Sequence, residues 1–202
     1  MTIIEEIKAA AKDSFVPIVR DDTLDALIRL ICKKKPQKIL EIGTAVGYSG
    51  IKMLENSNAT LTTIEKNEGR ANEASKNFER SGLTNRVNLI CGDAAEVLSD
   101  LTKKEEKFDL IFLDGPKGQY IKYLPFLKQL LLGGGTIFAD NVGLLGLVEH
   151  SEKVNHKNRT MVRNMQAFLK QITEDEDFET QIFDIDDGYA ICNKKQKNDR
   201  NI

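Results

Sequence analysis

Short apolar runs alternate with amphipathic, helix-like segments along most of this chain, and this alternation constrains the fold more than any other feature of the sequence. The apolar runs predict five strands, at 38–43, 61–66, 87–93, 108–114 and 136–141. Consecutive parallel strands need a crossover, which is usually a helix. The alternation therefore predicts a mostly parallel sheet with helices on both faces.

Apolar residues at helical spacing predict the helices between these strands. They are expected at 22–34, 48–56 and 69–80, and a later helix carries Ile121, Leu124, Leu127 and Leu131. Gly133 to Gly135 are predicted to end that later helix, before a strand that begins at Thr136.

The C-terminal part follows a different pattern. A long helix is expected around 161–172, followed by strands at about 179–186 and 189–194. Asp187-Gly188 lies between these two strands, and an Asp-Gly pair in that position predicts a β-hairpin. We therefore expect an α/β fold with a Rossmann-like, doubly wound sheet of about seven strands, mostly parallel with a C-terminal antiparallel hairpin.

The length of 202 residues suits one domain with a single core. Residues 1–35 are predicted to form N-terminal helices, 36–194 the Rossmann-like core, and 195–202 a flexible polar tail.

Composition and cysteine spacing exclude several functional classes. The net charge of -2 argues against a protein that is basic over its whole surface. No apolar run is long enough to cross a membrane and no signal peptide is evident, so we expect a cytoplasmic protein without a membrane partner. The cysteines lack the spacing of a zinc site or redox pair, and each is expected to be a small buried apolar residue: Cys32, Cys91 and Cys192.

A glycine-containing turn follows the first predicted strand. Gly43 and Gly47 permit a tight turn and a close approach of the backbone to a ligand. Their G-x-x-x-G spacing differs from the G-x-G-x-x-G pattern that binds a pyrophosphate, which disfavours an NAD-dependent dehydrogenase. The alternative is an ordinary glycine-rich turn before a helix.

Acidic residues follow the next two strands. Glu65 lies about 20 residues past the glycine turn, where an acid is placed to bind ribose hydroxyls. Asp93 would accept a hydrogen bond from an adenine amino group, while the small Ala94 leaves room for the adenine ring. Alternatively, Glu65 is a solvated acid at a strand end, and Asp93 caps the short helix that follows it.

Three oxygen-bearing side chains follow the fourth and fifth strands, which are expected to be neighbours. Asp114, Asp140 and Asn141 offer ligands that suit Mg²⁺. Lys117, three residues beyond Asp114, would act beside the metal as a general base. The alternatives are that Asp114 caps a helix, that Asp140-Asn141 starts a turn, and that Lys117 is an exposed surface residue.

With these motifs in view, the chain resembles the metal-dependent O-methyltransferases, which include the catechol and caffeoyl-CoA enzymes. The similarity covers roughly residues 15–194 and includes LEIGTAVGYS, IEK, GDA, FLDGPKGQY and ADN. A Rossmann-like sheet that ends in a hairpin is also the architecture of class I methyltransferases.

The resemblance implies S-adenosylmethionine and Mg²⁺ as cofactors. It implies metal binding by Asp114, Asp140 and Asn141, catalysis by Lys117 together with Asp114, and cofactor binding by Val19, Glu41, Gly43, Ser49, Glu65, Asp93, Ala94 and Asp114. Family members are often homodimers, so the resemblance also implies a homodimer.

Within this family the chain is most similar to bacterial tRNA 5-hydroxyuridine methyltransferases, on the grounds of VPIV, DNVGLLGLV, RTMVR and IDDGYAI. This implies methylation of 5-hydroxyuridine at the wobble position of the tRNA anticodon. The basic stretch 150–163 is a candidate for RNA phosphates or simply a solvated helix start. Gly143-Leu144, which follows Asp140-Asn141-Val142, departs from the pattern of relatives, so the resemblance does not predict the loop that contacts the substrate.

Two other functions remain as alternatives. One is O-methylation of a small catechol-like molecule, although the absence of tryptophan removes the tryptophan gatekeepers of the catechol enzyme. The other is a non-catalytic, nucleotide-binding Rossmann module, which would not need Lys117 beside three metal-type ligands.

Overall fold

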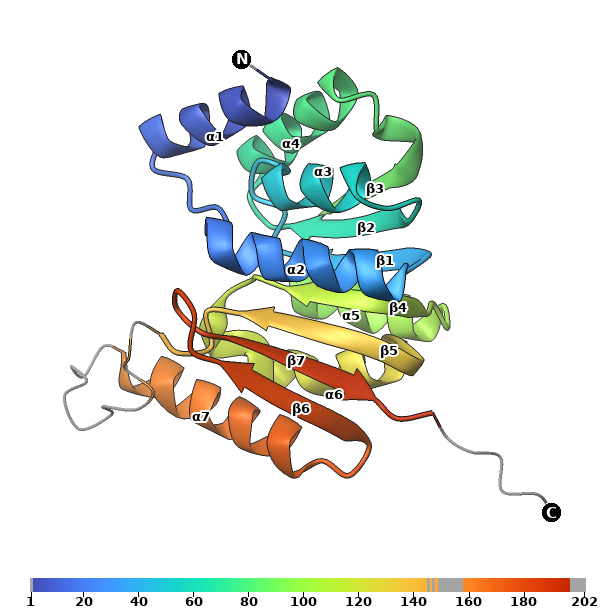
Figure 1. Cartoon of the computed structure of the whole chain (residues 1–202), viewed down its shortest axis with the longest axis vertical. Helices are drawn as coiled ribbons and strands as arrows, with labels where there is room; N and C mark the ends of the chain where they lie inside the picture. Colours follow the sequence, from blue (N-terminus) through green and yellow to red (C-terminus); the bar gives the residue numbers. More distant parts are fainter. Residues whose placement is uncertain (1, 145, 147, 149–157, 197–202) are drawn as a thin grey trace.

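The computed structural model describes residues 2–144, 146, 148 and 158–196 (Figure 1). These residues contain a seven-stranded sheet of order β3-β2-β1-β4-β5-β7-β6, which confirms the predicted fold class. The strands are β1 Lys38–Ile42, β2 Thr60–Glu65, β3 Val87–Cys91, β4 Phe108–Leu113, β5 Leu131–Asp140, β6 Phe178–Phe183 and β7 Tyr189–Lys194.

Strand direction separates the sheet into two parts. The strands β3, β2, β1, β4 and β5 pair in parallel, whereas β7 is antiparallel to both β5 and β6. The chain order reverses between β1 and β4, so their carboxyl ends form the switch point where ligands bind in such sheets.

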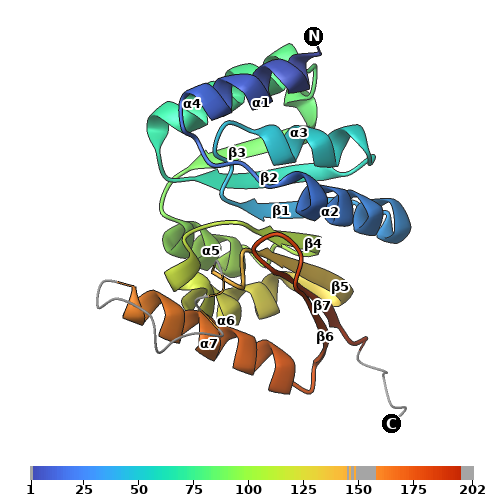
Figure 2. The same cartoon turned by 60° about the vertical axis from the view of Figure 1, so that its left-hand side comes forward.

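Helices cover both faces of the sheet (Figures 1 and 2). One face carries the first four helices and the other carries the last three, as the two core clusters show. The helices are α1 Ile3–Asp13, α2 Asp21–Lys34, α3 Tyr48–Glu55, α4 Glu68–Arg80, α5 Ala94–Lys103, α6 Tyr120–Leu130 and α7 Arg159–Glu174, with short 3₁₀ turns η1 Thr84–Arg86 and η2 Lys117–Gln119.

The central strands are mostly apolar because both of their faces are covered, and Glu41 in β1 is a buried exception. Phe112 and Phe138 are fully buried on neighbouring strands and make an edge-to-face contact, with ring centroids 5.9 Å apart. Tyr189 stacks on Phe138 at 4.9 Å and so joins the hairpin to the parallel part of the sheet. This packing fixes the strand ends that carry the polar residues described below.

The prediction for Gly133 to Gly135 is wrong. These glycines lie inside β5, which begins at Leu131, and α6 has already ended at Leu130. The register against β4 shifts between Phe108 and Leu110, so the glycine segment forms an irregular bulge. A Cβ on Gly135 would lie 2.9 Å from the Asp109 carbonyl oxygen, which explains glycine there by close backbone approach.

The expectation that all three cysteines are buried is correct only for Cys192. Cys32 is exposed because α2 packs through residues such as Leu24, Leu27 and Ile31, and Cys32 lies off that face. Cys91 is exposed because it ends β3, which is an edge strand.

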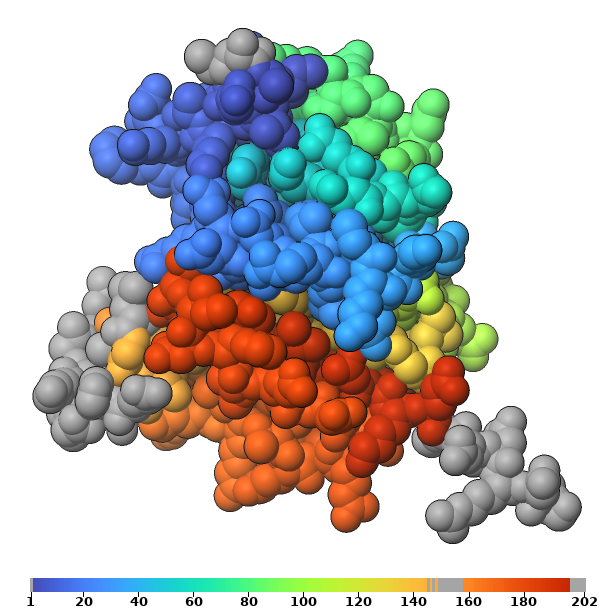
Figure 3. Space-filling view, viewed as in Figure 1, coloured from blue at the N-terminus to red at the C-terminus, as the bar shows by residue number. Residues whose placement is uncertain are grey.

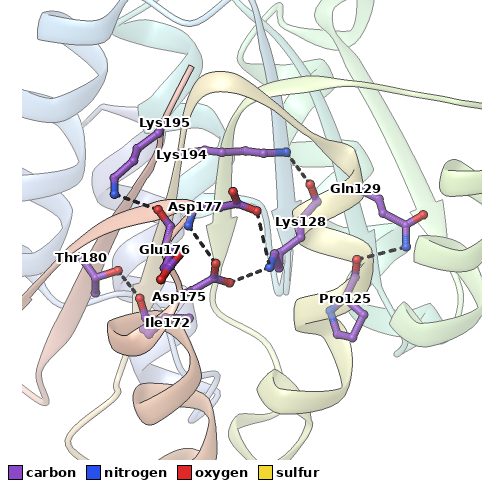
Figure 4. Close-up of polar contacts among 10 residues, drawn as sticks. All are labelled: Pro125, Lys128, Gln129, Ile172, Asp175, Glu176, Asp177, Thr180, Lys194 and Lys195. Atoms are coloured by element: carbon purple, nitrogen blue, oxygen red, sulfur yellow. Dashed lines mark hydrogen bonds and ion pairs between the residues drawn. The ribbon is translucent and has the colours of Figure 1, made fainter. Parts of the chain in front are cut away.

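The amino-terminal edge of the parallel strands is held by a polar cluster (Figure 4). Lys128 Nζ lies 2.6 Å from Asp175 Oδ2, and Lys194 Nζ donates to the main-chain oxygens of Lys128 and Leu131. These contacts join α6 to the segment between α7 and β6 and to the end of β7. The cluster is at the edge of the sheet opposite the switch point.

Among the described residues, no helix is both long and apolar enough to cross a membrane. Of the predicted tail, only Lys195 and Gln196 belong to the described residues.

Candidate active site

A cavity of about 600 Å³ lies at the carboxyl ends of the parallel strands. The residues that follow β1, β2, β3, β4 and β5 all contribute to its wall. Pro17 and Ile18, from the segment between α1 and α2, close part of it. A cavity in this position matches the ligand site of an open α/β sheet.

Gly43 is required by the contact between two strand ends. Its φ is +104°, and a Cβ there would lie 2.3 Å from the Asp114 carbonyl oxygen. The Asp114 N–H in turn donates to the Ile42 carbonyl at 2.9 Å. A side chain at position 43 would therefore push Asp114 out of place. Glycine at this position allows the turn after β1 to lie directly against the residue that follows β4.

Glu65 lines the cavity at the end of β2 and is held by main-chain donors. Its Oε2 accepts the Ala45 N–H at 2.9 Å, and its Oε1 accepts the Asn67 N–H at 2.8 Å. Ala45 has a φ of +47°, a left-handed conformation that is uncommon for alanine. The glycine turn is thus folded onto the acid that is predicted to bind ribose.

Glu41 is completely buried under the cavity and does not line it. Ser49 Oγ donates to its Oε1 at 2.5 Å, and Thr63 Oγ1 donates to its Oε2 at 2.6 Å. Burial raises the pKa of Glu41 to about 7, against the lowering effect of these two hydroxyl groups. Val19, also buried, lies outside the cavity wall, so the cofactor roles of Glu41, Ser49 and Val19 stay predictions.

Asp93 and Ala94 both line the cavity at the end of β3. Asp93 is the N-cap of α5, and its Oδ1 accepts the Ala95 N–H at 2.9 Å. Its Oδ2 pairs with Lys66 Nζ at 2.9 Å. Asp93 therefore caps α5, as the alternative interpretation expected. It also lines the cavity where the adenine contact is predicted.

Asp114, Lys117 and Tyr120 form a connected group after β4. Lys117 Nζ lies 2.6 Å from Asp114 Oδ1 and 3.0 Å from the Tyr120 hydroxyl oxygen. Burial lowers the pKa of Lys117, but Tyr120 and Asp114 raise it by more, so it lies above its ordinary value. The lysine is a partly buried cavity residue and not the exposed surface residue of the alternative interpretation.

Asp140 and Asn141 line the same cavity at the end of β5. The Asp140 side chain is almost fully buried, and its Oδ1 accepts the Asn141 N–H at 2.6 Å. Burial and the charge of Asp114 raise the pKa of Asp140 to about 7. Asn141 has a φ of +54°, so the backbone leaves the strand in a left-handed conformation at this point.

The donors at this end of the cavity fit a hard divalent cation. Two carboxyl groups at adjacent strand ends, one of them buried, are electrostatically unfavourable unless positive charge compensates them. In the part of the chain that the structure describes, no three His, Cys, Asp or Glu side chains converge. An ion held by Asp114, Asp140 and Asn141 would therefore keep positions for water and substrate, as Mg²⁺ commonly does.

Tyr120 is a site residue that the sequence patterns did not single out. Its hydroxyl group lies 2.9 Å from the Leu113 carbonyl oxygen and 3.1 Å from that of Asp140, and it accepts from Lys117. It thereby joins the ends of β4 and β5 to the lysine. The available signals were its place at the end of the FLDGPKGQY segment and its position three residues after Lys117, where η2 passes into α6.

The basic stretch 150–163 falls mostly outside the described residues. Arg159 and Arg163, at the start of α7, are described and exposed. In the same helix, Asn164 Nδ2 donates to the Gly118 carbonyl oxygen at 2.8 Å, next to Lys117. The start of α7 is therefore attached to the end of the cavity that carries Lys117.

A Rossmann-like sheet with a C-terminal hairpin, an acid after β2 and polar groups after β4 and β5 defines a class I methyltransferase architecture. Comparison with known proteins agrees with this class. A model of the O-methyltransferase family matches residues 4–195, so the chain belongs to the O-methyltransferase family, whose members are S-adenosylmethionine-dependent enzymes.

Individual relatives support this membership. The catechol O-methyltransferase of Niastella koreensis is 38% identical over 119 residues, covering 57% of this chain and 53% of that protein. The chain thus spans about half the length of this curated relative.

Solved structures are similar over nearly the whole chain. A Staphylococcus aureus protein provisionally named a caffeoyl-CoA O-methyltransferase has a TM-score of 0.88 at 33% identity, covering 96% of this chain and 93% of that one. An O-methyltransferase from Bacillus cereus in complex with SAH has a TM-score of 0.86 at 27% identity, with coverages of 96% and 90%.

Proposed function

We propose that this chain transfers a methyl group from S-adenosylmethionine to a hydroxyl group of a small catechol-like molecule, with the help of Mg²⁺. The observation that carries the proposal is the group at the end of β4 and β5. There Lys117 contacts Asp114 at 2.6 Å beside the buried Asp140, in the same cavity as Glu65. Similarity to a catechol O-methyltransferase and to a protein bound to SAH, the demethylated form of the cofactor, supports this proposal.

The cofactor would extend along the cavity from the glycine turn to the end of β3. Glu65 would bind the ribose hydroxyls, since its oxygens are already oriented by the N–H groups of Ala45 and Asn67. Asp93 and Ala94 would border the adenine. This places the methionine part, and hence the methyl group, toward Gly43 and Asp114.

Asp114, Asp140 and Asn141 would hold the metal ion. When bound, Mg²⁺ supplies positive charge that lowers the pKa of a hydroxyl group placed beside it. Lys117 would remove the hydroxyl proton, which requires the lysine to be neutral. In the structure Asp114 and Tyr120 keep its pKa high, so the base role requires that the Asp114 carboxylate be engaged elsewhere.

The remaining chain holds the reacting groups in place. Tyr120 fixes Lys117 against the ends of β4 and β5. Pro17 and Ile18 line one side of the cavity and would help to exclude water from it once the cofactor is bound. Attack on the methyl group requires an approach of roughly 3–3.5 Å between the reacting atoms, so such alignment contributes directly to the rate.

A second candidate substrate is 5-hydroxyuridine at the wobble position of the tRNA anticodon, which also offers two neighbouring oxygens. The observation that favours it is the pair of exposed arginines, Arg159 and Arg163, on a helix tied to Gly118. The similarity to catechol and caffeoyl-CoA enzymes favours the small-molecule substrate.

The deciding experiment supplies labelled S-adenosylmethionine and Mg²⁺ with either a simple catechol or tRNA that carries 5-hydroxyuridine. We expect label in the catechol, and we expect excess chelator to abolish the transfer. Label in the tRNA alone would overturn the small-molecule proposal. Undiminished transfer in chelator would overturn the metal-dependent mechanism.

A further inference from the structure

The loop 184–188, which joins β6 to β7, contacts the segment that follows the proposed metal ligands. The Val142 N–H donates to the Gly188 carbonyl at 2.9 Å, and the Gly143 N–H donates to the Asp187 carbonyl at 2.8 Å. A Cβ on Gly143 would lie 2.9 Å from the same Asp187 oxygen. The two backbones are therefore in direct contact immediately after Asp140 and Asn141.

The same loop also binds the start of α2. The Thr23 N–H and the Thr23 hydroxyl both donate to Asp186 Oδ2, at 3.0 and 2.9 Å. Figures 1 and 2 show the hairpin loop reaching toward the beginning of α2, and Figure 3 shows the hairpin packed against this helix. These bonds join residues that are 163 positions apart.

Asp186 replaces a cap that the local sequence does not supply. The N-cap position of α2 is Arg20, whose side chain makes no capping hydrogen bond. The first N–H groups of a helix lack partners within the helix, and a carboxylate is well suited to bind them. Asp186 adopts a φ of +56° in doing so, a left-handed conformation that aspartate tolerates better than most residues.

The start of α2 is directly connected to the cavity wall. Pro17 and Ile18 line the cavity, and only two residues separate Ile18 from Asp21, the first residue of α2. Thr23 is almost fully buried, whereas Asp186 is exposed, so the buried threonine gives these two hydrogen bonds a partly buried setting. One loop thus holds the N-terminal wall on one side and the chain after Asn141 on the other.

We infer that Asp186 is a positioning residue for the cofactor: it fixes the Pro17–Ile18 wall against the cavity and ties that wall to the segment that follows the metal ligands. The inference rests on the proposed function, because it assigns the cavity to S-adenosylmethionine. Asp186 does not line the cavity and acts only through Thr23 and the hairpin backbone.

The test compares S-adenosylmethionine binding, measured by calorimetry, in the wild type and in Asp186→Gly. Glycine adopts the left-handed conformation without strain, so this change removes the carboxylate and spares the backbone. Loss of two hydrogen bonds to a charged group should raise the Kd roughly fivefold to tenfold. Asp186→Asn keeps an acceptor oxygen and should restore the Kd to within about twofold of the wild type.

Asp175→Ala is the matched control. It removes a carboxylate that binds Lys128 at the opposite edge of the sheet (Figure 4), so it also breaks a hydrogen-bonded ion pair. We expect it to lower the melting temperature and leave the Kd unchanged. A purely structural role for Asp186 would instead give the same Kd in Asp186→Gly as in the control, and this result would overturn the inference.

Hydrogen exchange of the ligand-free protein separates this inference from the proposed function. In Asp186→Gly, amides 20–24 should exchange roughly tenfold faster than in the wild type, since the cap that holds them is lost. Unchanged exchange there would refute the positioning role even if the wild type binds S-adenosylmethionine. Failure of the wild type to bind it would refute the proposed function, and with it the cofactor part of the inference.

Discussion

The two ends of the cavity differ in how their acidic groups are stabilised. At the end of β2, each oxygen of Glu65 accepts a main-chain N–H, so the acid is oriented by the fold itself. At the ends of β4 and β5, Asp140 is buried close to Asp114, and this environment raises its pKa to about 7. The end at Glu65 is therefore preformed, whereas at the other end the Lys117 ammonium compensates Asp114 and a bound cation would stabilise the buried Asp140 further.

This difference explains why glycine and tyrosine occupy the boundary between the two ends. Gly43 lets the turn after β1 contact the backbone of Asp114. This contact fixes the distance between the glycine turn and the residues that follow β4. Tyr120 connects the Leu113 and Asp140 carbonyls and thereby fixes β4 relative to β5. The electrostatically unfavourable end is thus built on a rigid support.

The largest expected effect is at the metal end. Replacing Asp140 by alanine removes a buried, proposed metal ligand, and we expect methyl transfer to fall roughly a thousandfold or more. Binding of S-adenosylmethionine in the absence of metal should change by less than about threefold, because the cofactor end is held separately. Steady-state kinetics and calorimetry measure the two quantities. An equal loss in both would show that the two ends are not independent.

Lys117 provides the next largest effect. In Lys117→Met the side chain still fills its partly buried position but cannot accept a proton, so kcat should fall roughly a hundredfold to a thousandfold. The Kd for S-adenosylmethionine should stay near that of the wild type. Lys117→Arg is the control for charge, since arginine keeps the ion pair with Asp114 but does not lose its proton. Activity of the arginine variant near that of the wild type would rule out the role of Lys117 as a base.

The raised pKa of Asp140 predicts a pH-dependent stability of the metal-free protein. In the unfolded chain this carboxyl group ionises near its ordinary pKa of about 4, and in the folded protein only near 7. The unfolded state therefore loses the proton first, and Asp140 makes the folded state less stable as pH rises between these values. Glu41, whose pKa is also about 7, acts in the same direction.

Asp140→Asn tests this contribution because an amide cannot ionise and still accepts the Asn141 N–H. Above pH 7 and without metal, we expect the variant to be more stable than the wild type by about 1–2 kcal/mol. Below pH 4 the difference should disappear. Urea unfolding at several pH values measures it, and Mg²⁺ should stabilise the wild type alone. A constant difference across the pH range would contradict the unfavourable burial of Asp140.

The fold was predictable from sequence wherever local pattern and burial agree. The strands from β1 to β4 follow from apolar runs with both faces covered, and the Asp187-Gly188 hairpin follows from its turn residues. The start of β5 was not predictable in this way. Gly133 to Gly135 look like a helix terminator, and only pairing with β4 places them in a strand.

The site was predictable to the level of strand ends. Glu65, Asp114, Asp140 and Asn141 all line the cavity, as expected for residues that follow adjacent parallel strands. The contact between Asp186 and Thr23 had no local signal, because it depends on how the hairpin docks on α2. Burial of Glu41 below the cavity could not be inferred either, since its neighbours Ser49 and Thr63 come from other elements.

The smallest expected effect on turnover concerns Glu65 and sharpens the comparison at its preformed end. Glu65→Gln keeps one acceptor oxygen but turns an amide NH₂ toward either the Ala45 or the Asn67 N–H, so one main-chain donor loses its partner. We expect the Kd for S-adenosylmethionine to rise roughly tenfold, while kcat at saturating cofactor changes by less than about threefold. Glu65→Asp is the control that retains the charge and shortens the reach to the ribose. If the glutamine variant lost kcat and kept its Kd, Glu65 would belong with the reacting groups, and the division of the cavity into a preformed end and a cation-dependent end would fail.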